Sequence, residues 1–420
     1  MTLHVREEDA RSFSLDRYIK AGDTISWGQA SAEPTTLTAL LVEQRATLGG
    51  VRCILGIPVA DTFRPEHADH LAFLSYCATG SNRRLNEAGA LDIVPSAYSD
   101  FPDLLRTGNL RPDVAFVLLS PPDAEGRYSF GPGVDFTPDV VSGARIVIAE
   151  VSDRVPYTYG GPFLLEDDLD VVLHSAVAPA ERATPVPSAN VLAIARRVAE
   201  LVEDRATLQF GLGAIPEAVL GLLQDRRDLG IHTGFLCDAV LPLIESGTVT
   251  NERKTVDVGK SVAGLLIGTT LLFNYAHRNA LLSIRETRYT HDRSVLAAQD
   301  QFVAINSALE VDLTGQVNSE SIDGRYLGAI GGAGDFLRGA ARSNGGIPIV
   351  ALPAERIVSA LSGPASVARS DAGVIVTEHG SVDLRGRTLA HRRELMISIA
   401  HPANRATLDT TTPGLVAQGR

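Results

Sequence analysis

The sequence has few cysteines and no pattern typical of a zinc knuckle or a disulfide framework. Its 420 residues include three cysteines, Cys53, Cys77 and Cys237, which are widely spaced and lie among apolar or mixed neighbours. An odd number at such spacing favours reduced thiols over disulfides. Residues 1–20 carry many charges and lack an apolar core segment, so we expect neither a signal peptide nor a membrane span there. We therefore expect a cytoplasmic protein.

The sequence also lacks an excess of basic residues. Its formal net charge is -12, which argues against a general nucleic-acid or anionic-membrane surface, because both recruit Lys and Arg. We expect a small-molecule substrate and neither nucleic acid nor membrane as partner. His67 and His70 would share one face of a helix, but no third ligand with metal-site spacing is nearby, so we expect no metal site.

Apolar residues are abundant, at 45% of the chain, and they occur in short continuous runs between helical segments. Such runs are typical of parallel strands that helices cover on both faces, whereas alternation would indicate a half-exposed sheet. The pattern predicts an α/β fold. We predict strands at 24–27, 53–56, 114–119, 145–149 and 207–210, and helices at 36–45, 191–201 and 216–224.

Length and one proline-rich stretch divide the chain into two parts. A chain of this length is too long for one ordinary core. Residues 177–190 contain three prolines and few large apolar residues, which is typical of a linker. We predict an N-terminal domain at 1–180 and a C-terminal domain at 191–420, each of the α/β class.

Two glycine-rich loops precede predicted helices. Gly211 and Gly213 would let backbone amides approach a ligand at a helix N-terminus, which favours negative charge; a tight strand-to-helix turn is the alternative. Pro216 stands where the third glycine of a dinucleotide site would fall, which disfavours that site. The run 328–336 has four glycines, whose amides could polarise a thioester carbonyl, and a hairpin turn is the alternative there.

Motifs spread over the whole chain point to one family. They lie at 119–123, 126–131, 149–151, 209–219, 306–318, 331–336, 377–380 and 384–386. Taken in this order they resemble the acetyl-CoA hydrolase/transferase family, which includes 4-hydroxybutyrate and succinyl-CoA:acetate CoA-transferases. The resemblance implies two domains of the NagB/RpiA/CoA-transferase type with the active site in the cleft between them, and a homodimer or larger assembly. It also implies an acyl-CoA substrate that brings coenzyme A with it, and no permanently bound cofactor.

The resemblance implies a catalytic glutamate at a position where this chain has glycine. In relatives, a glutamate following the threonine of a pattern like Ile231-His232-Thr233 attacks the acyl-CoA and becomes a glutamyl-CoA thioester. This chain has Gly234 there, which has no side chain to act as a nucleophile. The space it leaves suggests a bulkier acyl group than acetate or butyrate. Where relatives carry an asparagine that steadies the glutamate, this chain has His291.

The glycine loops supply the expected binding groups. Gly332, with Gly331 before it, matches the glycine whose backbone amide the family uses as an oxyanion donor. We expect contacts to CoA from residues of both loops: Gly211, Gly213, Gly334 and Asp335.

Three side chains are candidates for the missing chemistry. We hypothesise that His291 activates water, because a histidine with a pKa near neutrality is a natural general base. His232 is a competitor, because positions 232 and 234 would share a face on an alternating strand. Glu33 is a further candidate from a loop that faces the cleft in relatives. The alternatives are a hydrogen-bonded core histidine in either case and a solvated loop residue for Glu33. Cys237 lacks a visible base.

Three functions remain open at this point. The first is an acyl-CoA hydrolase that cleaves a thioester or a carbon–carbon bond without a glutamyl-CoA intermediate. The second is a CoA-transferase that moves CoA between an acyl-CoA and a carboxylic acid by way of a displaced carboxylate. The third is a non-catalytic protein that binds a CoA ligand.

Overall fold

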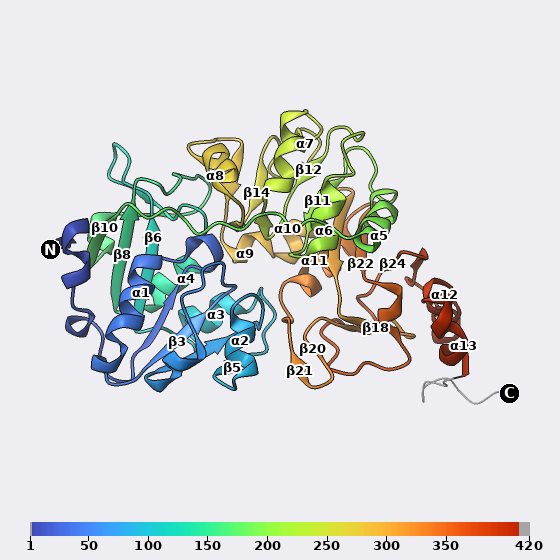
Figure 1. Cartoon of the computed structure of the whole chain (residues 1–420). Helices are drawn as coiled ribbons and strands as arrows, with labels where there is room; N and C mark the ends of the chain where they lie inside the picture. Colours follow the sequence, from blue (N-terminus) through green and yellow to red (C-terminus); the bar gives the residue numbers. More distant parts are fainter. Residues whose placement is uncertain (1, 411–420) are drawn as a thin grey trace. The chain divides into compact units, whose positions relative to one another are not determined.

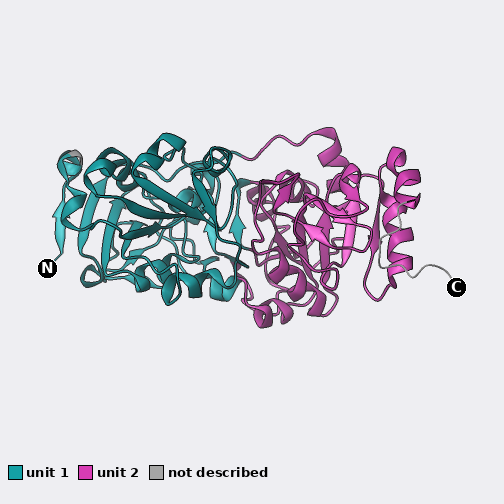
Figure 2. Cartoon of the chain, turned by 90° about the horizontal axis from the view of Figure 1, so that it is seen from below, with its two compact units in different colours: residues 1–183, 234–238, 262–290 teal, residues 184–233, 239–261, 291–420 magenta. Residues whose placement is uncertain are grey.

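The computed structural model describes residues 2–410, which form two compact units (Figure 2). Unit 1 comprises residues 1–183, 234–238 and 262–290, and unit 2 comprises the remainder. The first change of unit, at Thr184, falls inside the proline-rich stretch 177–190. Two later segments return to unit 1, which a division into 1–180 and 191–420 does not describe. Residues 411–420, the end of the expected C-terminal domain, lie outside the described residues.

Unit 1 is built on an eight-stranded sheet in which all neighbouring strands are parallel. The central strands are fully buried, as their continuous apolar runs predict. In sheet order the strands are β1 (Leu3–Val5), β10 (Val171–Ser175), β8 (Ile146–Ser152), β6 (Val114–Leu119), β2 (Thr24–Trp27), β3 (Val51–Leu55), β4 (Leu71–Ser75) and β5 (Leu91–Ile93).

Helices cover the sheet of unit 1 (Figure 1). Leu37, Leu40 and Leu41 of α1 belong to the same core cluster as residues of β2, β3 and β4, and α4 contacts β2 and β6. The helices are α1 (Thr35–Gln44), α2 (Asn82–Glu87), α3 (Phe101–Arg106), α4 (Thr137–Gly143), α8 (Thr270–Ala276) and α9 (Thr287–Thr290). The returning segments also bring β13 (Phe235–Leu236), which pairs in parallel with β15 (Leu265–Leu266).

Unit 2 has a six-stranded sheet that is parallel except at one edge, where the last two strands form an antiparallel pair. Its strands in sheet order are β12 (Gly230–Ile231), β11 (Thr207–Phe210), β17 (Phe302–Ser307), β22 (Ile347–Ala351), β24 (Val374–Thr377) and β25 (Gly380–Asp383). Its helices are α5 (Ala189–Ala199), α6 (Ala214–Leu220), α7 (Leu241–Glu245), α10 (Arg293–Ala297), α11 (Ala333–Arg342), α12 (Leu389–Ile399) and α13 (Pro402–Thr410).

The predicted elements are confirmed in kind, and their ends differ by a few residues. Strands 24–27, 114–119 and 207–210 have the predicted bounds. The helix expected at 216–224 begins at Ala214, because Gly213 with φ 151° is its N-cap and places the turn two residues earlier.

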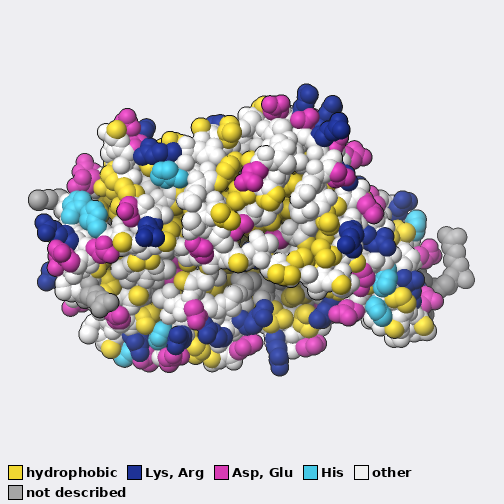
Figure 3. Space-filling model, turned by 45° about the horizontal axis from the view of Figure 1, so that its top comes forward, with side chains coloured by type: hydrophobic (Ala, Val, Ile, Leu, Met, Phe, Trp, Pro, Cys, Tyr) yellow, Lys and Arg dark blue, Asp and Glu magenta, His cyan; other side chains and the backbone are white. Residues whose placement is uncertain are grey.

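No helix among residues 2–410 is both long enough and apolar enough to span a membrane. On the face drawn in Figure 3, Lys and Arg side chains lie in small groups among acidic side chains. In this same part of the chain, no three His, Cys, Asp or Glu side chains are grouped as metal ligands would be.

Candidate active site

His291 is buried in unit 2 and directly precedes Asp292, the N-cap of α10. The Asp292 side chain accepts hydrogen bonds from the backbone N–H groups of Ser294 (2.7 Å) and Val295 (3.0 Å), which caps α10 and fixes the chain beside His291. Burial and, to a smaller extent, nearby His232 together lower the pKa of His291 to about 3. The imidazole is therefore neutral at pH 7 and able to accept a proton, but its pKa is well below the near-neutral value expected from sequence.

Gly332 is where the glycine-rich loop meets His291. Gly332 is the N-cap of α11, and Gly331 before it has φ 62°, a conformation that favours glycine. A Cβ atom at Gly332 would lie 2.6 Å from His291 Nε2, so the ring occupies the space that a side chain would need. The ring also packs on Phe336, at 4.4 Å between centroids. The first N–H groups of a helix have no partner within the helix, so this end of α11 offers donors beside the imidazole.

Gly334 and Asp335 lie in the first turn of α11 and differ in their surroundings. A Cβ atom at Gly334 would meet nothing within 4 Å. Asp335 is buried, and its carboxylate lies 3.5 Å from the Arg293 guanidinium. That ion pair joins α11 to α10, and contacts of Gly334 and Asp335 to CoA stay predictions.

His232 is completely buried in unit 2. Its backbone N–H donates to the carbonyl of Leu208 at 3.0 Å, and its Nδ1 lies 3.5 Å from Gln299 Nε2. The shared-face argument for positions 232 and 234 does not apply, because β12 ends at Ile231 and the next strand begins at Phe235. What the structure does bring together is the two histidines, which influence each other electrostatically.

The first glycine loop packs tightly against β17. The backbone N–H of Gly211 donates to the carbonyl of Ile305 at 2.8 Å. Cβ atoms at Gly211 and Gly213 would each lie 3.2 Å from a side-chain oxygen, of Asn306 and Ser307 respectively. The tight strand-to-helix turn thus accounts for both glycines, and their contact with CoA stays a prediction.

Gly234 belongs to unit 1 and has backbone contacts there. Its carbonyl accepts hydrogen bonds from the N–H groups of Gly264 (3.0 Å) and Leu265 (3.1 Å). The carbonyl of Gly264 in turn accepts from the N–H of Asp135 at 3.3 Å. The backbone at the position of the missing nucleophile is therefore linked to a buried acidic residue.

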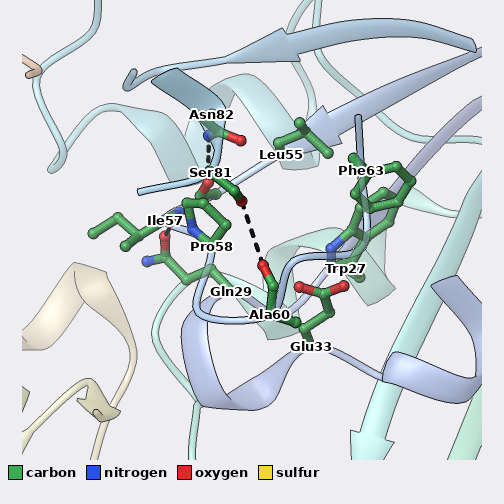
Figure 4. Close-up of a pocket in the computed structure, with 11 residues that line it drawn as sticks. Trp27, Gln29, Glu33, Leu55, Ile57, Pro58, Ala60, Phe63, Ser81 and Asn82 are labelled. Atoms are coloured by element: carbon green, nitrogen blue, oxygen red, sulfur yellow. Dashed lines mark hydrogen bonds between the residues drawn. The ribbon is translucent and has the colours of Figure 1, made fainter. Parts of the chain in front are cut away.

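Glu33 is buried in unit 1 instead of being a solvated loop residue. Its Oε1 accepts hydrogen bonds from the hydroxyls of Thr38 (2.9 Å) and Thr62 (2.7 Å). Burial raises the pKa of Glu33, and these hydroxyls oppose the change. Glu33 lines a small cavity together with Trp27 and Phe63, whose rings stack at 5.2 Å (Figure 4).

Asp135 is a buried acid that the sequence did not single out. Its Oδ2 accepts hydrogen bonds from Gln29 Nε2 (2.6 Å) and the Tyr98 hydroxyl (2.7 Å). Gln29 Oε1 accepts from the Tyr76 hydroxyl and from the N–H of Ile57, both at 2.8 Å. Burial raises the pKa of Asp135 to about 6. The signal in the sequence was weak, a single acid after two glycines.

Lys254 is the second buried group that the sequence missed. Its ammonium donates to the carbonyls of Ile231 (2.9 Å) and Lys260 (2.7 Å), while Asn251 Oδ1 accepts from the N–H of Ile231 at 2.9 Å. These side chains replace a neighbouring strand at the open edge of β12, next to His232. Burial lowers the pKa of Lys254 to about 8.

Two regions of the chain match known family domains. Residues 13–173 match the acetyl-CoA hydrolase/transferase N-terminal domain, and residues 268–412 match the C-terminal domain. The chain is 33% identical over 395 residues to the 4-hydroxybutyrate coenzyme A transferase of Clostridium kluyveri, covering 91% of this chain and 92% of that protein. It is 36% identical over 352 residues to the succinyl-CoA:acetate/propanoyl-CoA:succinate CoA transferase of Fasciola hepatica, covering 81% and 73%.

Solved structures agree with these matches. The crystal structure of RipA from Yersinia pestis superposes with a TM-score of 0.90 at 32% identity, covering 97% of this chain and 96% of that one. The 4-hydroxybutyrate CoA-transferase of Porphyromonas gingivalis superposes with a TM-score of 0.79 at 29% identity, covering 97% and 96%. The predicted tandem α/β fold is therefore confirmed.

Proposed function

Because this chain belongs to the acetyl-CoA hydrolase/transferase family, we propose that it hydrolyses an acyl-CoA without forming a glutamyl-CoA intermediate. The observation that carries the proposal is Gly234, which has no side chain where the resemblance implies the nucleophile. Neither Thr233 nor Phe235, the residues beside it, is a carboxylate. Water is the simplest remaining nucleophile.

His291 and the start of α11 supply what water attack needs. His291 Nε2 faces Gly332 and takes a proton as the water oxygen bonds to the thioester carbon. Backbone N–H groups at the α11 terminus stabilise the oxyanion that forms. The negative intermediate raises the low pKa of the imidazole, because an opposite charge favours its protonated form. The imidazolium then returns the proton to the leaving CoA sulfur, which gives a free acid and CoA.

The second candidate function is CoA transfer, which is the activity named for the two curated relatives. Transfer without a glutamate at position 234 needs a displaced carboxylate, and Glu33 is the candidate. Its burial and raised pKa argue against this role, because a neutral carboxyl is a poor nucleophile.

Product analysis separates these reactions. The purified protein is incubated with a panel of acyl-CoAs, with and without a carboxylic acid acceptor, and products are measured by mass spectrometry. Hydrolysis of the thioester predicts free CoA without an acceptor, whereas carbon–carbon cleavage predicts a new carboxylate on a product that keeps its CoA. Transfer predicts dependence on the acceptor and a residue trapped by borohydride, and that result would overturn the proposal.

The Gly234→Glu variant tests the same point from the other side. If the missing carboxylate is what prevents transfer, this variant gains acceptor-dependent exchange and a borohydride-trapped glutamate at position 234. A Gly234→Gln variant is the matched control, because it has nearly the same size but no carboxylate. Equal behaviour of the two variants would mean that the carboxylate at 234 is not the deciding group.

A further inference from the structure

Two buried carboxyl groups, Glu150 and Glu33, interact at the start of α1 in unit 1. Glu150 accepts four hydrogen bonds: from the N–H (2.9 Å) and hydroxyl (2.6 Å) of Thr36, the N–H of Leu37 (3.3 Å) and the hydroxyl of Ser175 (2.9 Å). Backbone donors at a helix N-terminus favour a negative charge. Glu150 is therefore the carboxyl that holds the charge at this helix end.

Fewer hydrogen bonds stabilise a negative charge on Glu33 than on Glu150. Its Oε1 accepts from two hydroxyls, of Thr38 and Thr62, and no described residue donates to its Oε2. Burial raises the pKa of both carboxyls, and Glu150 raises that of Glu33 further. Of two interacting carboxyls, the less supported one keeps the proton. In the protonated form of Glu33 the proton is on Oε2, because Oε1 already accepts from both hydroxyls.

The cavity beside Glu33 is small and has a mixed lining, in which Gln29, Ser81 and Asn82 are polar and the larger side chains are apolar. Trp27 and Phe63 form one wall, and Leu55 and Ile57 contribute further apolar surface (Figure 4). Its volume is about 10 Å³, which is room for one water-sized group. None of the described residues that line it is Lys, Arg or His. A phosphate of CoA is too large for this volume and finds no cation among the lining residues, so this cavity suits the acyl end of the substrate.

We propose that Glu33, as a neutral carboxylic acid, donates a hydrogen bond from Oε2 to an uncharged oxygen on the acyl group, such as a ketone or hydroxyl oxygen. This inference rests on the proposed function, because it takes an acyl-CoA as substrate. The cavity accommodates that single oxygen. A second carboxylate on the acyl group is disfavoured, because its charge would be desolvated without a cation. The enzyme therefore prefers oxygen-bearing neutral acyl groups over plain alkyl or dicarboxylic ones.

Three CoA thioesters with four-carbon acyl groups test the preference: acetoacetyl-CoA, butyryl-CoA and succinyl-CoA. For the wild-type enzyme we expect kcat/KM to be about tenfold or more higher for acetoacetyl-CoA than for the other two, the value of one buried hydrogen bond. The Glu33→Gln variant keeps a neutral donor and retains this order. The Glu33→Leu variant has a similar size without a donor and loses it. Equal loss in both variants, or a preference for succinyl-CoA, overturns the proposal.

A measurement without substrate separates this proposal from the proposed function. The infrared difference spectrum between wild type and Glu33→Gln at pH 7 is expected to contain the carbonyl band of a protonated carboxyl, and a carboxylate band instead overturns the proposal. If no acyl-CoA is turned over, the proposed function fails, and calorimetry with non-hydrolysable thioethers of acetoacetyl-CoA and butyryl-CoA decides the preference. Circular dichroism checks that each variant is folded. If Glu33→Leu does not fold, the infrared comparison of wild type with Glu33→Gln is the deciding test.

Discussion

Glu33 in unit 1 and His291 in unit 2 are both buried, and burial moves their pKa values in opposite directions. The pKa of the Glu33 carboxyl is raised, and that of the His291 imidazole is lowered to about 3. Each shift favours the uncharged form of its group. The comparison teaches that burial favours the uncharged form in both candidate regions, so a charge on either group is stabilised only by what binds beside it.

The two groups also differ in what holds them. Glu33 is held by hydroxyl donors on neighbouring elements, whereas His291 lies against a backbone that lacks a side chain at Gly332. A hydroxyl can be removed at modest cost, but a Cβ atom in the space of the ring moves the ring itself. Substitutions in unit 2 are therefore expected to affect activity more strongly than those in unit 1.

The largest expected effect is that of His291→Ala. Removing a general base lowers kcat by about 10²–10⁴-fold, and steady-state hydrolysis assays measure it. The exposed His379→Ala in the same unit is the control and leaves kcat unchanged. Because the pKa of His291 is about 3, wild-type kcat has no inflection near pH 6.5 from this group. Unchanged activity of His291→Ala would remove the histidine from the mechanism.

The Gly332→Ala variant is expected to have the second-largest effect on activity. Its Cβ would lie 2.6 Å from His291 Nε2, so the ring is displaced, and a shift of this kind lowers kcat by about 10²-fold. Gly221→Ala at the C-cap of α6 in the same unit is the matched control, because its Cβ would meet only the Ala218 carbonyl oxygen at an ordinary 3.7 Å. Equal activity of the two variants would contradict the role of the close contact.

The Asp135→Asn variant tests the raised pKa of a second buried carboxyl in unit 1, through its effect on stability. The folded pKa of Asp135, about 6, lies above its usual 3.8, so the folded state binds the extra proton. The stabilisation that this proton gives is present below pH 4 and is lost as the pH rises through 6. The free energy of unfolding falls by no more than about 3 kcal/mol over this range. Urea unfolding at pH 4, 5, 6 and 7 should give a smaller pH dependence for the variant, and an identical dependence would count against the raised pKa.

Thr62→Val is expected to have the smallest effect. It removes one of the two donors to Glu33 Oε1, which costs about 1 kcal/mol of unfolding free energy. Because that hydroxyl lowers the pKa of Glu33, Glu33 keeps its proton over a wider pH range in the variant. Thermal unfolding measures the loss, and the preference for acetoacetyl-CoA should survive. Loss of the preference would mean that Glu33 depends on this hydroxyl for its position.

Sequence reasoning worked best where the signal is local. The continuous apolar runs at 24–27, 114–119 and 207–210 predicted the strands with their observed bounds. A run of this kind indicates a strand that is buried on both faces of the sheet. The glycine-rich loop before α11 was also recognised, because several glycines in a short segment require a turn or a close approach.

The site was harder to predict because its properties depend on packing. The contact between Gly332 and His291 joins residues that are far apart in the sequence. The pKa of His291 depends on complete burial, which a sequence does not state, and the ordinary value led to the expectation of a near-neutral base. Asp135 and Lys254 were missed for the same reason, since an isolated acid or base in a sequence resembles any solvated residue.

The division of the chain into two units has a consequence for its synthesis. Unit 1 needs residues 234–238 and 262–290, so its fold is completed only after most of the strand and helix elements around β11 and β12 have left the ribosome. A fragment cut in the stretch 177–190 would lack β13, β15, α8 and α9 and would expose apolar surface that they cover. Truncation there therefore separates unit 1 from two of its segments, and a recombination with a relative that keeps unit 1 whole has to exchange three separate segments together.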